Sequence, residues 1–181
     1  MSTTTITPIP AGTYNVDPAH SNVGFAVKHM GIATVRGAFK RFQGTLDATD
    51  DAPVLRGVVE VASVDTGDEQ RDAHLAAPDF FDVQQNPEIR FHSTGVDSTG
   101  GELELRGEIT IKGVTKPIEL TGTIAEGGTD PWGNERVGIE LEGVIDRREF
   151  DLSWNQTLPG GGLLVANEVK LLVSASAVKE A

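Results

Sequence analysis

The stretch ELELRGEITIKGVTKPIELTGTI, residues 102–124, decides the fold class of this chain. Apolar and polar side chains alternate along it, which is the period of a β-strand with one buried face. The apolar face of its first half consists of Leu103, Leu105, Ile109 and Ile111. The segment KGVT at 112–115 turns the chain, and the apolar alternation then resumes at Ile118, Leu120 and Ile124. These residues therefore predict an antiparallel hairpin.

The same alternation recurs on both sides of this hairpin, and it predicts eight or nine strands in all. The expected inward-facing sets are Val23, Phe25 and Val27; Val59 and Val61; Ile89 and Phe91; Val137, Ile139, Leu141 and Ile145; and Val169, Leu171, Val173, Ala175 and Ala177. Residues 125–135 are rich in Gly, Pro and Asp and predict a long hairpin loop. An antiparallel sheet with one apolar face must bury it in a sandwich or a closed barrel, and the residues alone leave both open.

Helical signals are few in this sequence. Thr66 and Glu69 fit a capping box, residues 68–76 lack Gly and Pro, and Pro78 ends the segment, so a short helix is expected there. Residues 29–33 are a second candidate for a helical turn.

Length and composition limit the classes of function. The 181 residues suit one domain, here 12–181, preceded by a flexible leader at 1–11. The net charge of -12 argues against nucleic acid or an anionic membrane face as partner. Because Cys is absent, thiol catalysis, disulfides and zinc fingers are excluded. No apolar stretch is long enough for a secretory signal or a membrane span, so a cytoplasmic location is expected.

Enzyme signatures are scarce. The motifs GxxxxGK[ST], GxSxG and HExxH are absent, as is GxGxxG after a strand. The four histidines are His20, His29, His74 and His92, with no pair at the spacing of metal ligands, so isolated histidines are favoured over a metal site. Gly160–Gly162 is interpreted as a flexible loop rather than a phosphate-binding loop, because no Lys or Ser/Thr follows it in the P-loop manner.

A polar cluster accompanies the expected helix and is followed by two aromatic residues, Phe80 and Phe81. Arg71 and Asp72 either join the helix to the sheet by a salt bridge or, with His74, orient a ligand. Catalysis is the weaker interpretation because no nucleophile accompanies the cluster. Consecutive strand residues face opposite sides, so one of the two phenylalanines is expected to cap a pocket. Trp132 and Trp154 suit either the rim of an opening or the core.

Several blocks of this sequence, taken in order, resemble the YceI-like family. They are DPAHSNVGF at 17–25, KHMG at 28–31, VRGAF at 35–39, RDAHL at 71–75, DFFD at 79–82, PEIRF at 87–91, GEITIKGVTKP at 107–117 and DRREF at 146–150. The resemblance covers about residues 12–178. It implies an all-β, extended lipocalin-like antiparallel β-barrel of about eight strands with one or two short helices. It also implies that a long polyisoprenoid or other linear lipid lies in the lumen, that the protein is a homodimer, and that it is not an enzyme.

The resemblance and the apolar pattern together suggest which residues bind the ligand, a polyisoprenoid or isoprenoid quinone, with no other cofactor and no metal. Removing each CH₂ from water gains about 0.8 kcal/mol, so a long chain needs few polar contacts. The head group is expected near His20, His29, Arg71, Asp72 and His74. The expected tunnel lining is Phe25, Val27, Phe39, Phe42, Val59, Val61, Phe81, Phe91, Ile109, Leu120, Ile139, Leu141 and Trp154.

Three hypotheses for function follow. The leading one is a binding protein for an isoprenoid lipid, acting in its transport, storage or sequestration. The second is an enzyme acting on an apolar substrate, with His74 or His29 as the general base and Asp72 orienting it. The third is a barrel whose interior is filled by side chains and which serves as an interaction module.

Overall fold

A computed structural model describes residues 9–50 and 52–181, so most of the leader predicted at 1–11 lies outside the described residues. The described part contains eleven strands: β1 Thr13–Val16, β2 Asn22–His29, β3 Ala33–Phe39, β4 Phe42–Asp47, β5 Val54–Glu60, β6 Val64–Asp65, β7 Glu88–Thr99, β8 Glu102–Ile111, β9 Val114–Thr129, β10 Glu135–Asp146 and β11 Val165–Lys179. It also contains the helix α1, Glu69–Ala76, and 3-10 turns at Pro18–His20, Val61–Ser63 and Arg147–Phe150.

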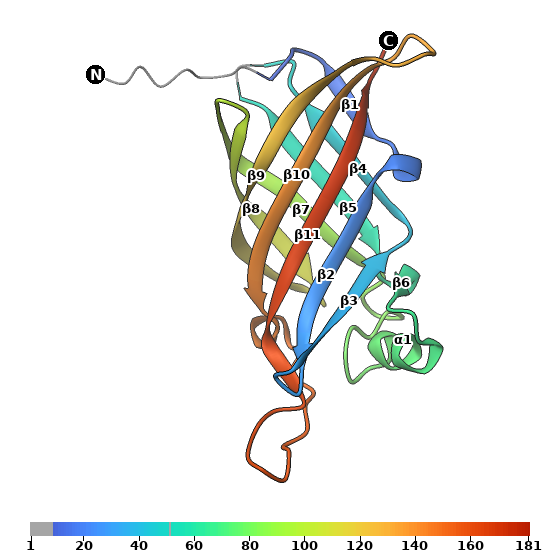
Figure 1. Ribbon diagram of the computed structural model, residues 1–181, viewed down its shortest axis with the longest axis vertical. Coiled ribbons are helices and arrows are strands. Elements are labelled where there is room, and N and C mark those ends of the chain that lie inside the picture. The colour runs from blue at the N-terminus through green and yellow to red at the C-terminus, as the bar shows by residue number, and fades with distance from the viewer. Residues whose placement is uncertain (1–8, 51) are drawn as a thin grey trace, which may run out of the picture.

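Eight of the strands close into an antiparallel barrel (Figure 1). Their order is β1-β4-β5-β7-β8-β9-β10-β11, and β11 pairs back with β1 from Tyr14↔Lys179 to Val16↔Ala177. That last pairing removes the open edges of the ring. The choice between sandwich and barrel is thereby settled for the barrel, as the family resemblance implied.

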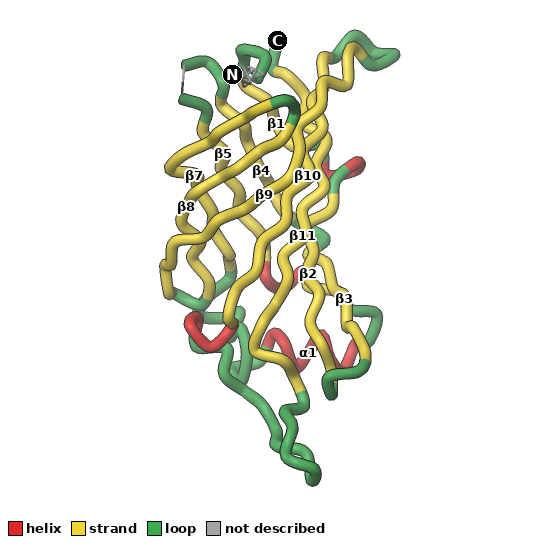
Figure 2. The backbone as a smooth tube through the Cα atoms, turned by 60° about the vertical axis from the view of Figure 1, so that its left-hand side comes forward, coloured by secondary structure: helices red, strands yellow, loops and turns green. Residues whose placement is uncertain are grey.

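A side branch extends the wall at one end of the barrel. Only the last residues of β11 pair with β1, and the rest of that edge pairs with β2 from Ser174↔Asn22 to Val165↔His29. Strand β3 pairs with β2, and the short β6 pairs with β3. Helix α1 lies at this same end (Figure 2) and contacts β6. At this end, β2, β3, β6 and α1 form the wall in place of the closed ring. The larger cavity described below lies here.

The hairpin predicted from residues 102–124 is confirmed. Strands β8 and β9 pair from Ile111↔Val114 to Glu102↔Thr123. The connecting Lys112 and Gly113 have φ angles of 50° and 77°, the left-handed conformation that a tight two-residue hairpin turn requires. The apolar residues of β8 and the predicted inward set of β10 are all buried. The loop expected at 125–135 is shorter, because β9 and β10 continue to Thr129 and from Glu135.

Helix α1 occupies the predicted place but begins differently. Asp68 caps it by accepting hydrogen bonds from the backbone N–H groups of Gln70 and Arg71, so the expected capping box at Thr66 is wrong. Thr66 instead donates its hydroxyl and its backbone N–H to Asp72 at 2.6 and 2.9 Å. Residues 30–32 form the turn between β2 and β3 and not a second helix.

An ion-pair network lies at the end of the barrel opposite α1. The Arg136 guanidinium binds Asp17 at 3.0 Å and Asp130 at 2.8 Å. Hydrogen bonds from His20 and then Arg136 lower the pKa of Asp17 from 3.8 to about 2. The backbone N–H of Asn134, and then Arg136, lower the pKa of Asp130 from 3.8 to about 2. The network joins the β9–β10 turn to the turn before β2.

We expect Arg136→Gln to lower the melting temperature at pH 6 and to have little effect near pH 2. Both carboxyl pKa values are lower in the folded protein, so these pairs stabilise the fold above about pH 4, and that contribution is lost as the pH falls through about 2. Melting curves across this range measure the difference. Arg106→Gln, which removes the exposed pair with Asp97, is the control with a small effect. A pH-independent difference for Arg136→Gln would contradict the assignment.

Candidate ligand-binding cavities

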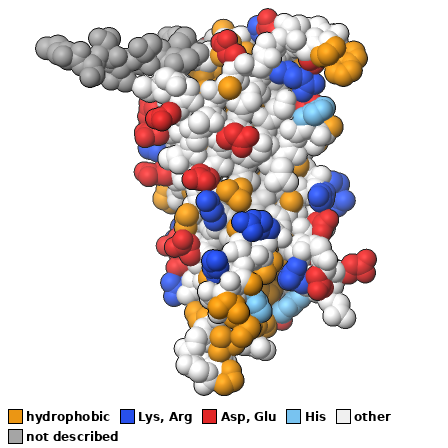
Figure 3. Space-filling view, viewed as in Figure 1, with side chains coloured by type: hydrophobic (Ala, Val, Ile, Leu, Met, Phe, Trp, Pro, Cys, Tyr) orange, Lys and Arg blue, Asp and Glu red, His pale blue; other side chains and the backbone are white. Residues whose placement is uncertain are grey.

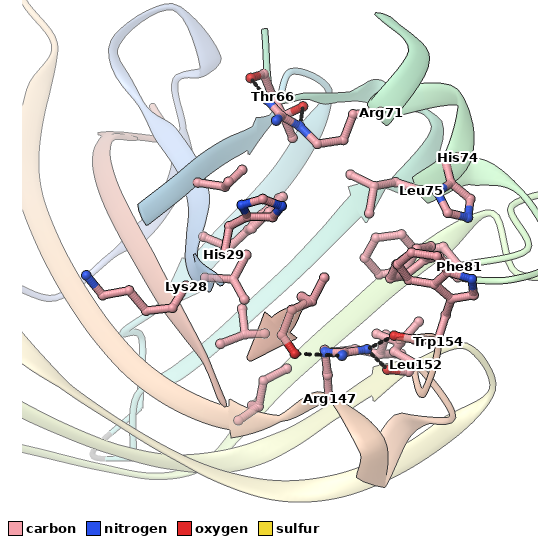
Figure 4. Close-up of a pocket in the computed structure, with 18 of the residues that line it drawn as sticks. Lys28, His29, Thr66, Arg71, His74, Leu75, Phe81, Arg147, Leu152 and Trp154 are labelled. Carbon is pink, nitrogen blue, oxygen red and sulfur yellow. Dashed lines mark hydrogen bonds between the residues drawn. The ribbon is translucent and has the colours of Figure 1, made fainter. Parts of the chain in front are cut away.

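The larger cavity, here called the outer cavity, lies at the α1 end of the molecule and has a volume of about 330 Å³ (Figure 4). Strands β2, β3 and β11, helix α1, the segment after α1 and the segment after β10 supply its wall. Apolar side chains line most of it: Phe25, Val27, Val35, Phe39, Leu75, Phe80, Phe81, Ile89, Ile111, Ile145, Leu152, Trp154, Leu164, Val165, Val169 and Leu171.

A second cavity of about 160 Å³, here called the inner cavity, lies inside the barrel. Its apolar lining comes from strands on all sides of the ring. The two cavities share four lining residues: Phe39, Ile89, Ile111 and Leu171. They are therefore neighbours, and the ring of Phe39 belongs to the wall between them. The presence of two cavities speaks against a barrel interior filled by side chains.

Most of the expected tunnel residues border these cavities. Phe25, Val27, Phe81 and Trp154 border the outer cavity, Phe42, Val59, Phe91, Ile109, Leu120, Ile139 and Leu141 border the inner cavity, and Phe39 borders both. Val61 borders neither. The chain leaves the strand at Glu60 and makes a 3-10 turn at 61–63, so the alternation ends and Val61 packs with Phe39 and Val64 instead. Its binding role is therefore corrected to a packing role, whereas the roles of the others stay predictions.

The expected head-group residues are only partly brought together. His29, Arg71 and His74 border the outer cavity. His20 does not, because it lies in the turn at Pro18–His20 and pairs with Asp17 at 2.8 Å. Asp72 does not border it either. Neither Arg71 nor Asp72 forms a salt bridge in the described part of the chain. Arg71 donates to Thr66 (Figure 4), and Asp72 accepts from Thr66.

The suggested acid/base pair of His74 and Asp72 is not formed. The His74 ring meets Phe80 and Trp154 edge-on, with ring centroids 5.0 and 4.8 Å away. Its Nε2 lies 3.4 Å from a carboxylate oxygen of Asp79, whereas Asp72 accepts from Thr66. The histidine is therefore held by an aromatic cluster at the cavity wall. Of the two tryptophans, Trp154 belongs to this cluster and Trp132 is 80% exposed in the β9–β10 turn.

Arg147 borders the outer cavity and was not singled out from the sequence. It is only 4% exposed, and burial lowers its pKa. The guanidinium donates to the backbone carbonyls of Leu152, Trp154, Val165 and Ala166. The guanidinium of the neighbouring Arg148 forms an ion pair with the carboxylate of Asp146 at 2.5 Å. In the sequence, Arg147 is marked only by its place in the DRREF block at 146–150, one of the blocks that resemble the YceI-like family.

Exposed apolar side chains gather at the α1 end of the molecule (Figure 3). Met30, Ile32 and Leu163 are 45%, 81% and 45% exposed, and they belong to the β2–β3 turn and the loop before β11. The two segments are joined, because the Met30 N–H donates to the Leu164 carbonyl at 2.8 Å. An apolar ligand passing through this end would meet apolar side chains first.

Within residues 9–50 and 52–181, no group of three His, Asp or Glu side chains is placed to hold a metal ion. No helix in this part of the chain is long and apolar enough to cross a membrane.

This chain is similar to known proteins both in sequence and in structure. The profile of the YceI-like domain matches residues 14–177. "Protein YceI" of Escherichia coli O157:H7 is 35% identical over 175 residues, covering 94% of this chain and 88% of that protein. The crystal structure of BcnA from Burkholderia cenocepacia aligns with a TM-score of 0.76 and 27% identity over 89% of this chain and 98% of that one. A polyisoprenoid binding domain from Saccharophagus degradans aligns with a TM-score of 0.68, covering 92% and 98% of the two chains, and at 14% identity it shows the shared fold alone.

Proposed function

The chain belongs to the YceI-like family, and from this premise we propose that it binds a linear isoprenoid lipid, of the polyprenyl or quinone type, for transport, storage or sequestration. One observation carries the proposal: two neighbouring apolar cavities share four side chains, so a chain-like molecule can occupy both. Burial of hydrocarbon supplies the affinity, reduced by the entropy of ordering the chain. The solved relative described as a polyisoprenoid binding domain has the same fold and supports this class of ligand.

We propose binding without catalysis. His74 packs against two aromatic rings, and the Asp72 carboxylate that would have oriented it is engaged by Thr66. A general base needs an orienting partner and a substrate proton within reach. Asp72 is not that partner, and the carboxylate that does contact His74, Asp79, is 62% exposed and lies 3.4 Å from Nε2. The expected homodimer and cytoplasmic location stay predictions.

We expect Leu171→Trp to abolish the retention of an apolar ligand. Leu171 borders both cavities, so a larger ring at this position occupies the space through which a chain would run. Native mass spectrometry and solvent extraction of protein purified without detergent measure the ligand that remains bound. Leu172→Trp is the matched control, because residue 172 faces a groove on the outside of the barrel with Glu140 and Ser174.

Circular dichroism and melting curves establish that both variants fold. Retention at the parent level in folded Leu171→Trp would overturn the cavity assignment. Parent protein that never carries an apolar compound, and never takes one up when it is offered, would overturn the proposed function itself.

A further inference from the structure

Two uncharged loops project from the α1 end of the molecule (Figures 1 and 2). They are the β2–β3 turn at 30–32 and the loop before β11 at 157–164, and together they are here called the apolar tip. Neither Asp, Glu, Lys nor Arg occurs from 29 to 35 or from 152 to 167, although these residue types make up 23% of the chain. An uncharged surface in so charged a protein indicates an apolar partner.

Large apolar side chains extend from the tip into solvent. Of the five that are exposed among the described residues, three belong to the tip: Met30, Ile32 and Leu163. Figure 3 shows apolar side chains crowded at this end of the molecule. Single exposed apolar residues are ordinary on a protein surface, whereas a cluster marks a contact with an apolar partner.

The backbone of the tip is paired within the tip and its base. The loop before β11 closes on itself, because the N–H of Leu158 donates to Gly162 at 2.7 Å and that of Leu164 donates to Gln156 at 2.9 Å. The Met30 N–H joins the turn to this loop through the Leu164 carbonyl at 2.8 Å. An unpaired backbone group costs free energy when water is removed from it. The tip can therefore lose water without leaving these groups unpaired.

The charges beside the tip are balanced in sign. The exposed residues Lys28 and Arg36 flank the uncharged segment of the turn, and the exposed Asp151 and Glu168 flank that of the loop. A polybasic site would favour an anionic membrane. A balanced site suits zwitterionic head groups, which carry both signs. The net charge of -12 adds a repulsion from anionic lipid.

The size and place of the tip also bear on its partner. A stable interface between two proteins takes about 20–30 residues a side, more than these two short loops offer. The outer cavity lies directly behind the tip, because Leu164 within it and the adjoining His29 both border that cavity. A partner at the tip is thus next to the cavity.

We propose that the apolar tip docks on a zwitterionic lipid bilayer and inserts Met30, Ile32 and Leu163 at the boundary between head groups and acyl chains. A lipid then passes between bilayer and cavity along apolar side chains without crossing bulk water. The docking itself does not depend on which ligand the cavities hold. Only the passage of lipid rests on the proposed function.

Flotation of the whole protein with phosphatidylcholine vesicles tests the docking. We expect the parent to float with these vesicles, weakly and reversibly, and to do so equally at high salt, because salt screens charges and not apolar insertion. Ile32→Glu should lower the partition coefficient at least tenfold, since it replaces an inserted apolar side chain by a charge. Ile32→Ser removes the apolar side chain without adding a charge and should have an intermediate effect.

Trp132→Glu is the matched control. Trp132 is 80% exposed and Ile32 81%, both changes add one negative charge, and Trp132 lies in the β9–β10 turn at the opposite end of the barrel. This variant should float like the parent. An equal loss in both variants would show that added charge and not the tip decides binding, and would overturn the proposal.

Three further results would also overturn the docking. One is a parent protein that does not float with phosphatidylcholine vesicles. Another is flotation with phosphatidylglycerol vesicles alone that high salt abolishes, which shows electrostatic adsorption. The third is a parent dimer in analytical ultracentrifugation that Ile32→Glu dissociates, which assigns the tip to a second copy of the chain.

Vesicles that contain geranylgeraniol test the passage of lipid. We expect Ile32→Glu to reach the same final occupancy as the parent but at least fivefold more slowly, because Ile32 borders neither cavity. Equal rates of uptake would overturn the passage through the tip and leave lipid binding standing. Failure of the parent to take up lipid from vesicles or from solution would overturn the proposed function, whereas flotation decides the docking independently.

Discussion

Phe39→Ala is expected to lower the free energy of unfolding by about 3–5 kcal/mol, as removal of a buried phenylalanine typically does. Phe39 is only 7% exposed, and its ring lies 5.6 Å from that of Phe25 and 6.1 Å from that of Phe81. Because Phe39 borders both cavities, its removal should also join them into one longer space. Urea unfolding measures the first effect. The second should appear as tighter binding of longer isoprenoid alcohols relative to shorter ones.

Phe91→Ala is the matched control for chain length. Phe91 borders only the inner cavity, so its removal enlarges that space without opening the wall between the two. We expect this variant to be less stable than the parent but to keep the parent order of preference among chain lengths. The same change of preference in both variants would contradict the role of Phe39 as the partition, because cavity volume alone would then explain it.

Gly122→Ala is expected to destabilise the barrel by about 1–3 kcal/mol or more, the range of overpacking in a core. A Cβ atom at residue 122 would lie 1.7 Å from the carbonyl oxygen of Glu140 on β10. That oxygen belongs to the backbone of a paired strand, so β9 and β10 would have to separate locally. A strand glycine of this kind marks a close approach of two backbones.

Gly138→Ala tests this explanation from the partner strand. The nearest atom to a Cβ at residue 138 is the Ala125 carbonyl oxygen at 3.9 Å, an ordinary contact. With room for the methyl group, alanine reduces the entropy of the unfolded chain and should leave stability equal or raise it by about 0.4–1 kcal/mol. Urea unfolding should therefore show a loss of stability for Gly122→Ala and no loss for Gly138→Ala. A similar loss for both would mean that the close approach at Gly122 is not the cause.

The local alternation of the sequence was sufficient to predict the longest strands and the faces they bury. In the hairpin of β8 and β9, for example, the buried residues are those expected, because side chains on a strand must point alternately to its two faces. Alternation did not identify β1, β3, β4 or β6, and the described residues form eleven strands where eight or nine were expected. The same rule failed at Val61, where the chain turns directly after Glu60. Alternation carries no information about where a strand ends, and two apolar residues spaced by two do not distinguish a strand from a turn.

The candidate site shows a second limit. His29, Arg71 and His74 were predicted near the head group and do border the outer cavity, whereas His20 and Asp72 are held away from it by Asp17 and Thr66. Residue type suggested all five equally. The hydrogen-bond partner of each side chain decides where it points, and that partner is known only once the chain is folded.

The sequence by itself determined that this protein is a single antiparallel β-structure with one apolar face, since that information is local and repeats along the chain. Closure into a barrel depends on the pairing of β1 with β11, residues more than 160 positions apart, and only the tertiary structure shows it directly. The burial of Arg147 likewise requires carbonyls from 152–166 to gather around one side chain. Contacts between distant residues are set by the packing of the whole chain, and no local pattern of residue types encodes them.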